Sequence, residues 1–560
     1  MAGHLSSTLA MSRQFVDSIA PTFVNTTIIA GKFHPNMKSF IDNWGQVSSS
    51  IISLVVTLFL LAIYTVWKLF VAGQTYANAP IACIDPKRPK ATLPKARDRF
   101  RSDAITMLQE GYRQFKGRPW YVPSPLGERL MIPSKYVEEL KNAPVNEVDF
   151  VATFFEMFEG RYTTMGSRST LHPRVAKHEL NQNMAAVLDP IMEEIKDAFE
   201  EHLPTTEERK PVHVHDAIVN IVARVSSRMF GGVDLSRNKE WVDSTINFAL
   251  DGFVGAQAIK KYPTFVRPFV AKFIPALTKI KRHHATAQRV IVPILHEREK
   301  AAAAGWPESH GKPPADFLQW MLDAAVGDEK QKSFIAQIQL KLSFAAIHTS
   351  AAAPTQLLYD LCSLPQHIEG LRDEVNEARA SGEGELNKRT LLKLEKLDSL
   401  MKEAQRFNPL LLITFERIVT RPYTLSDGFR IPANTQIGVP TQAISMDPEL
   451  YPNPEVFDPL RFYKLKKLLD GRDPGAAGKL AFASSNHESM AFGYGRHACP
   501  GRWFAGNEIK MIMVYLLENY DFRLPEGKTG LENRPPSLCF ETQYLPNPQA
   551  VLEFRRRKTD

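Results

Sequence analysis

Cysteine is scarce in this chain of 560 residues. The four cysteines are Cys83, Cys362, Cys499 and Cys539, and no two of them form a Cys-x-x-Cys pair. A disulfide framework or a structural zinc site is therefore not expected. A reducing compartment suits the bulk of the chain.

The chain also lacks the signatures of nucleic-acid binding. Its formal net charge of +8 is compatible with nucleic acid, an anionic membrane surface or an acidic partner protein. However, the sequence has no zinc-finger spacing, no RNP-like aromatic motif and no dense block of Lys and Arg. We therefore expect no nucleic-acid partner.

Internal repeats are absent, and hydrophobic residues make up 44% of the chain against 23% charged residues. A large globular core is therefore expected. Helical apolar spacing occurs in residues 185–203, 331–362 and 388–407, and shorter β-like runs lie near residues 118–134 and 411–440. The pattern predicts a mainly α fold with a minor β-sheet over residues 101–560. An exposed loop is expected at residues 463–486, which are rich in Gly, Ala, Ser and charge.

One segment does not read as globular, namely the uncharged run from Ile51 to Trp67, which Leu69, Phe70 and Val71 extend past Lys68. The sequence predicts a single transmembrane helix at residues 51–71, with a buried core helix as the alternative.

The residues on either side of this run predict its orientation. Lys and Arg are frequent between residues 87 and 101 and sparse in residues 1–50. By the positive-inside rule, the C-terminal part is cytoplasmic and residues 1–50 are luminal. Asn25-Thr26-Thr27 would then be a glycosylation triplet, although such triplets also occur by chance. Residues 72–100, rich in Pro and basic residues, are expected to form a semi-rigid linker.

The most informative segment is Phe492–Arg502, with the sequence FGYGRHACPGR. Three glycines flank Cys499 here, and glycine allows tight bends and a close approach to a flat ligand. A strong helix candidate follows Gly501, and both loop amides and a helix N-terminus stabilise a thiolate. An inert core cysteine is one alternative. A small metal site shared with His497 is another, although no second ligand pair is present.

This segment resembles the haem-binding signature of the cytochrome P-450 family. Phe492, Gly495, His497, Cys499 and Gly501 fall on the signature, with His497 in place of the usual arginine. The resemblance covers roughly residues 90–555. It implies the P-450 fold, a haem b cofactor and Cys499 as the axial ligand of the haem iron.

Further motifs of the same family follow in the expected order. Glu403-Ala404-Gln405-Arg406 resembles its buried Glu-x-x-Arg ion pair, and Arg461 lies in the segment that completes that network. Taken alone, Glu403 and Arg406 would more often be a solvated surface pair.

Residues 345–350 (AAIHTS) resemble the family's distal helix, where small residues leave room above the iron. Thr349 would supply the hydroxyl that steers protons to oxygen. His348 stands where the family usually has an acid, so the usual acid–alcohol relay cannot be assumed, although histidine can shuttle protons near neutral pH. An ordinary Ala-rich helix is the alternative.

Haem propionates need cationic or polar partners. The resemblance suggests His497 and Arg417 for this role. It also suggests Lys177, although the Trp that usually accompanies that residue is missing. Each of these could instead be a surface charge.

The resemblance implies a monooxygenase that inserts one oxygen atom from O2 into a lipophilic small molecule. NADPH would supply the electrons through a separate reductase, since the sequence has no flavin-binding region. We expect the region of Lys510, with Arg496 or Arg502, to face that partner. Apolar residues 410–415 would line the substrate pocket. The aromatic segment 248–274 would form either a lipid-facing substrate gate or part of the core.

The motif style resembles filamentous-fungal enzymes of secondary metabolism, with a terpenoid or terpenoid–alkaloid substrate and an endoplasmic reticulum membrane location. Two alternatives remain open. One is a thiolate-haem isomerase or dehydratase that needs no reductase, and the other is a non-enzymatic membrane haem sensor or carrier. Thr349 argues against both, because neither requires proton delivery to oxygen.

Overall fold

The computed structural model describes residues 53–66, 76–125, 127–306 and 312–558. The chain divides into two compact units, Met1–Thr75 and Tyr76–Asp560.

In the first unit, residues 53–66 form a helix whose apolar side chains are mostly exposed. This helix lies within the predicted transmembrane segment 51–71. Among the described residues, no helix is both long and apolar enough to cross a membrane. The predicted luminal segment 1–50, including Asn25, lies outside the described residues.

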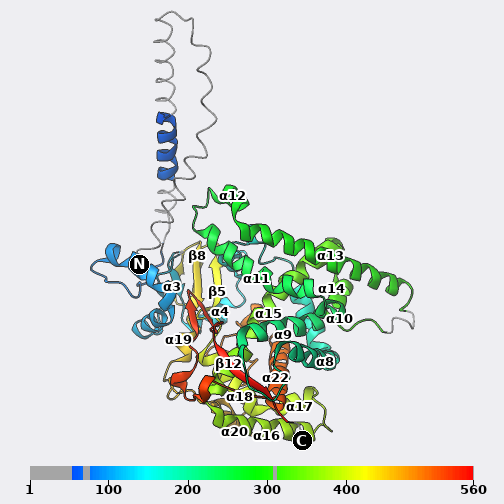
Figure 1. Ribbon diagram of the computed structural model, residues 1–560. Helices are drawn as coiled ribbons and strands as arrows, with labels where there is room; N and C mark the ends of the chain where they lie inside the picture. Colours follow the sequence, from blue (N-terminus) through cyan, green and yellow to red (C-terminus); the bar gives the residue numbers. More distant parts are fainter. Residues whose placement is uncertain (1–52, 67–75, 126, 307–311, 559–560) are drawn as a thin grey trace, which may run out of the picture. The chain divides into compact units, whose positions relative to one another are not determined.

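The second unit is mainly helical, as predicted. Its longer helices are α3 (Pro89–Gln114), α8 (Met184–His202), α9 (Val214–Gly231), α11 (Lys239–Lys260), α13 (Pro275–Ala303), α15 (Lys332–Ser363), α16 (Ile368–Ala380), α18 (Glu395–Phe407) and α22 (Arg502–Asn519). Shorter helices include α5 (Phe150–Met157), α7 (Leu171–Val175), α12 (Arg267–Val270) and α14 (Phe317–Ala324). Helix α15 runs through the middle of this body and packs against α9, α11, α13, α18 and α22 (Figure 1).

The helices form where the sequence repeats apolar residues at helical spacing. In α8, for example, Leu188, Ile191, Ile195 and Phe199 are buried on one face. The C-terminal half of α15 is buried all round, which explains why its sequence shows no polar face. The main hydrophobic core therefore lies among these helices, with α15 at its centre.

The main β-sheet has five strands in the order β1-β2-β8-β5-β3. They are β1 (Trp120–Val122), β2 (Arg129–Met131), β8 (Thr435–Val439), β5 (Thr414–Val419) and β3 (Val148–Asp149). Only the β2–β8 pair is parallel in this sheet, and Arg417 on β5 lies opposite Ile437 on β8. The predicted β runs near residues 118–134 and 411–440 thus pair with one another.

Smaller sheets complete the described part of the unit. Strand β12 (Val551–Arg556) pairs with β4 (Lys210–His213) and β9 (Tyr520–Arg523), and β6 (Tyr423–Thr424) pairs with β7 (Arg430–Ile431). A hairpin of β10 (Leu538–Phe540) and β11 (Gln543–Leu545) bridges to Leu411. The ring of Phe540 contacts Phe253 of α11 at 5.5 Å.

Two sequence predictions about connections are wrong. The predicted linker over residues 72–100 fails from Pro89 onward, because α3 begins there and buries Ala96, Phe100 and Ala104 at helical spacing. The predicted loop 463–486 instead includes most of α20 (Arg461–Leu469) and all of α21 (Pro474–Lys479). Asp473 caps α21 by accepting a hydrogen bond from the Ala476 amide at 2.9 Å.

Candidate active site

The segment predicted to bind haem forms a tight loop before α22. Gly493 and Gly495 adopt φ angles of 68° and 70°, which a residue with a side chain rarely adopts. A Cβ atom at Gly495 would also lie 2.6 Å from the Lys141 side chain. The Cys499 amide donates a hydrogen bond to the Phe492 carbonyl at 2.8 Å. Phe492 and Cys499 are thus tied together across the loop.

The Cys499 thiol lies at the head of α22, as predicted. Burial raises its pKa above the ordinary value, while the backbone amides of Gly501 and Arg502 donate to the sulfur and lower it. A metal cation bound to the sulfur would deprotonate it outright. A Cβ atom at Gly501 would meet no atom within 4 Å, so the loop leaves open space beside the cysteine. This donor set fits a haem iron.

Helix α15 presents small residues to open space. Ala345 and Thr349 are exposed in the middle of the helix, whereas Ile347 and Ser350 are buried. The Thr349 hydroxyl donates to the Ala345 carbonyl at 2.7 Å. Its lone pairs can still accept a hydrogen bond from the open side. This face has the features expected of an oxygen-binding helix.

His348 points elsewhere. Its Nε2 donates to the Ile246 carbonyl of α11 at 3.0 Å, which ties α15 to α11. Burial lowers the pKa of His348 and the hydrogen bond opposes that effect, so the ring is neutral at pH 7. Because consecutive helical residues lie about 100° apart, His348 and Thr349 face different directions. The role of His348 in proton delivery stays a prediction.

Glu508 is a buried acid that the sequence reasoning did not single out. It lies on α22 and accepts a hydrogen bond from the Ser226 hydroxyl at 2.8 Å, and the nearby Ser350 hydroxyl also acts on its carboxyl group. Burial raises its pKa to about 7, despite both hydroxyl groups. Ser350 directly follows Thr349, so a protonatable acid contacts the distal helix. Only the fold reveals this contact, because residues 350 and 508 are far apart in sequence.

Two basic side chains, His497 and Arg417, contact Phe150 of α5. The His497 ring stacks on Phe150 with centroids 5.0 Å apart, and the Arg417 guanidinium lies 4.7 Å from the same ring. Burial, Arg417 and Arg496 lower the pKa of His497 to about 4, and burial lowers that of Arg417 to about 10. The acids nearby already have partners, since Glu416 pairs with Arg129 at 2.9 Å and Asp149 with Arg168 at 2.8 Å.

The hydrogen bonds of these two basic side chains are incompletely satisfied. The His497 Nε2 atom is buried and has no hydrogen-bond partner among the described residues. Arg417 is buried and donates to the Glu416 carbonyl at 2.7 Å. An anionic group would supply the missing acceptor and offset the unbalanced charge. The residues therefore fit the propionates of a haem.

Lys177 lies apart from these two side chains in its contacts. It sits in a π-helical turn, η3 (Ala176–Leu180), with its side chain exposed. Within the described residues, no ion pair or side-chain hydrogen bond ties Lys177 to His497 or Arg417. Its proposed role in haem binding stays a prediction.

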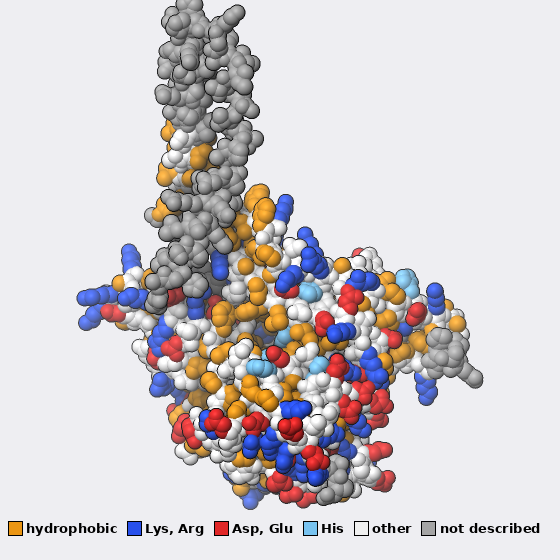
Figure 2. All heavy atoms as spheres, in the orientation of Figure 1, with side chains coloured by type: hydrophobic (Ala, Val, Ile, Leu, Met, Phe, Trp, Pro, Cys, Tyr) orange, Lys and Arg blue, Asp and Glu red, His pale blue; other side chains and the backbone are white. Residues whose placement is uncertain are grey.

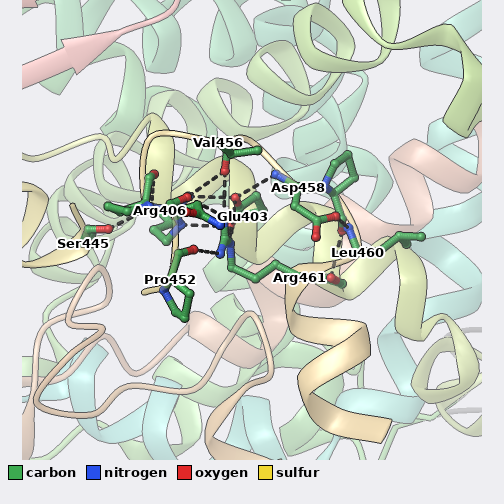
Figure 3. A network of polar contacts seen from close by, with 12 residues as sticks. Glu403, Arg406, Ser445, Pro452, Val456, Asp458, Leu460 and Arg461 are labelled. Carbon is green, nitrogen blue, oxygen red and sulfur yellow. Dashed lines mark hydrogen bonds and ion pairs between the residues drawn. The ribbon is translucent and has the colours of Figure 1, made fainter. Parts of the chain in front are cut away.

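The predicted network of Glu403, Arg406 and Arg461 is present (Figure 3). Arg406 forms two hydrogen bonds with the Glu403 carboxylate, at 2.8 and 2.9 Å, and Arg461 Nε lies 3.2 Å from both carboxylate oxygens. Glu403 is fully buried. The remaining guanidinium N–H groups of the two arginines donate hydrogen bonds to the backbone carbonyls of Ser445, Pro452, Asn453, Pro454 and Val456. The network thus holds residues 445–461 against α18.

Lys510 is not available to a partner protein. Its side chain is buried and its Nζ pairs with Asp398 at 2.8 Å. The prediction of a docking surface at Lys510 is therefore wrong, because this lysine lies on the core-facing side of α22. By contrast, Arg496 is exposed and Arg502 lies beside Trp503, which is 44% exposed.

The predicted aromatic gate divides into two parts. Phe253 of α11 packs against the core and, with Met157, Phe158 and Phe540, lines a pocket. Tyr262, Phe265, Phe269 and Phe273 lie around α12 and are exposed, Phe269 by 70% and Phe273 by 83%. Figure 2 shows hydrophobic side chains gathered over α12. A patch of this kind marks a binding surface for apolar partners.

Of the predicted pocket residues, Leu412, Ile413 and Phe415 are buried.

The fold and the cysteine loop define a haem-thiolate protein, and comparison with known proteins agrees. Residues 157–547 match the family model "Cytochrome P450". The chain is 36% identical over 462 residues to cytochrome P450 monooxygenase AN1598 of Emericella nidulans, covering 82% of this chain and 84% of that protein. It is 34% identical over 467 residues to ent-kaurene oxidase P450-4 of Gibberella fujikuroi, covering 82% and 89%.

The chain therefore belongs to the cytochrome P450 family. It is a monooxygenase with haem b as cofactor, and a separate reductase supplies electrons from NADPH. The isomerase and the non-enzymatic haem carrier are not favoured.

Proposed function

We propose that this monooxygenase oxidises a lipophilic terpenoid or terpenoid–alkaloid in fungal secondary metabolism, by hydroxylation, epoxidation or several successive oxidations. The observation that carries the proposal is the open face of α15, where Ala345 and Thr349 are exposed within a helix that is otherwise packed. The relatives include a protein named ent-kaurene oxidase, which supports a terpenoid substrate. Buried Leu412, Ile413 and Phe415 supply apolar lining.

In this proposal Cys499 would bind the haem iron through its sulfur, and Phe492, Gly495 and Gly501 shape its loop. His497 and Arg417 would hold the propionates, with Lys177 as a further candidate. The haem, when bound, supplies the iron at which O2 is reduced, while the protein orients the substrate and controls water.

Proton supply is assigned to side chains around α15. The Thr349 Oγ1 accepts a hydrogen bond from a water molecule in the open space and aligns it. Glu508, with its pKa raised to about 7, holds a proton next to Ser350 near neutral pH. His348 would join this supply only after leaving the Ile246 carbonyl.

We also propose that the protein is anchored in the endoplasmic reticulum membrane with its catalytic unit in the cytoplasm. The apolar run at residues 51–71, which Lys68 alone interrupts, and the exposed aromatic residues around α12 support membrane contact. Arg496 and Arg502 would face the reductase.

The test uses the full-length chain, reconstituted with a cytochrome P450 reductase and a panel of terpenoids. The expected result is one atom of label from ¹⁸O2 for each hydroxylation or epoxidation, with NADPH required. A product that forms without NADPH would favour the isomerase or dehydratase, and haem binding without turnover on any lipophilic substrate would favour the sensor or carrier.

A further inference from the structure

Lys341 is a half-buried lysine on α15 that contacts no acid within the described part of the chain. Removal from water lowers its pKa, and no neighbouring charge offsets this effect. A charged amine in such a place is costly unless an anion accompanies it. A negatively charged ligand beside the lysine would offset this cost.

Its position places it beside the proposed active site. Lys341, Ala345 and Thr349 are spaced four residues apart, so they lie along one face of the helix. With a rise of 1.5 Å per residue, Lys341 lies about 12 Å from Thr349 along the axis. Ala345 and Thr349 border open space. Lys341 thus stands two turns from the proposed oxygen site on the same face.

Two histidines with unsatisfied ring nitrogens lie near this lysine. His172 belongs to α7 and His284 to α13. Burial lowers the pKa of each ring to about 4, and the charge of Lys341 contributes to that shift. The Nδ1 atoms of both rings are buried and have no hydrogen-bond partner among the described residues. His284 Nε2 lies 2.7 Å from the Thr164 hydroxyl. If Nε2 accepts a hydrogen bond from the Thr164 hydroxyl, the ring proton of His284 lies on Nδ1. The Nδ1–H group then needs an acceptor.

The acid beside His283, Asp251, already has partners. The neighbouring His283 pairs with Asp251 at 2.9 Å, and Lys279 pairs with the same carboxylate at 3.3 Å. Aromatic rings also lie near this group. Phe248 packs edge-on against His284 at 5.6 Å and against Phe344 at 6.4 Å. The basic residues therefore lie next to the aromatic rings of Phe248 and Phe344.

We propose that Lys341, His172 and His284 form a subsite for the carboxylate of a lipophilic acid, which is held on α15 with its apolar body extending toward Thr349. This inference rests on the proposed function and names the chemical class of its substrate. The three residues supply an ammonium group and two ring N–H donors. The ligand carboxylate supplies the acceptors that the described residues do not.

The experiment compares matched ligand pairs that differ only in the acid group. The full-length holoenzyme in lipid nanodiscs is titrated with dodecanoic acid and dodecan-1-ol, and with abietic acid and abietinol, by isothermal titration calorimetry. At least one acid should bind about tenfold or more tightly than its alcohol, as expected for a charge-assisted hydrogen bond. Lys341→Met and Lys341→Gln should reduce that ratio to near one, and Lys341→Arg should retain it.

Lys332→Met is the control, because Lys332 lies on the same helix but pairs with Glu299, and it should leave the ratio unchanged. The inference is overturned if neither acid is preferred by the wild type, or if Lys341→Met keeps the preference. Haem loss in Lys341→Met, seen in the reduced CO spectrum, would show that Lys341 holds a propionate and would also overturn it. The ¹⁸O2 experiment tests the monooxygenase function independently, so the two failures are distinguishable.

Discussion

Replacement of Glu403 by glutamine tests the buried ion network directly. The carboxylate faces two guanidinium groups, with Arg406 at 2.8 Å and Arg461 at 3.2 Å, and it has no exposed surface. Glutamine keeps the size of the side chain and one oxygen acceptor. It removes the only charge in these contacts that balances two buried or partly buried cations.

The expected cost follows from that burial. Breaking a buried ion pair typically costs about 3–5 kcal/mol, because the partner charge stays buried and uncompensated. Both arginines keep backbone carbonyl acceptors here, so we expect the lower end, about 3 kcal/mol. With an unfolding entropy on the order of 1 kcal/mol/K for a unit of this size, the melting temperature should fall by about 3 °C.

The assay is thermal and urea unfolding of the full-length holoprotein, with haem content read from the reduced CO spectrum. Glu240→Gln is the matched control, since Glu240 pairs with Arg289 on the surface, with both side chains more than half exposed. That change should cost less than about 1 kcal/mol. If Glu403→Gln costs no more than Glu240→Gln, the network does not stabilise the fold in the way argued here.

Four further changes have defined outcomes. Cys499→Ser should abolish the thiolate-type band of the reduced, CO-bound protein, and an unchanged band would exclude Cys499 as the ligand. Deleting residues 1–72 should release at least part of the protein from membranes, whereas a soluble intact chain would refute the anchor. Thr349→Ala should lower product formed per NADPH by about tenfold or more, with peroxide released, because positioned proton-transfer groups typically contribute at least ~100-fold; an unchanged ratio would refute its role. Glu508 has a pKa raised from 4.5 to about 7, so its contribution to stability is complete below about pH 4.5 and is lost as pH rises through 7. Glu508→Gln should remove that decline, which is on the order of 3 kcal/mol, and identical unfolding profiles from pH 4.5 to 8 would contradict it.

The motifs that carry the family could be predicted because each is local. Phe492, Gly495, Cys499 and Gly501 lie within one loop, and the positive φ angle at Gly495 requires glycine whatever the rest of the chain does. Helix positions were also predictable, since apolar residues three and four apart must share a buried face. The start of α3 was not predicted, because its prolines and charges are typical of a linker, although Ala96, Phe100 and Ala104 repeat at helical spacing.

Only the tertiary structure decided which side chains meet across long separations in sequence. Phe150, Arg417 and His497 come from α5, β5 and the cysteine loop, and no spacing rule relates them. The burial of Lys510, the contact between Ser350 and Glu508, and the grouping of Lys341 with two histidines are of the same kind. Sequence periodicity states which face of a helix is apolar, but a side chain's partner depends on which other helix packs there. Whether a charge is solvated, paired or left for a ligand is therefore decided by packing.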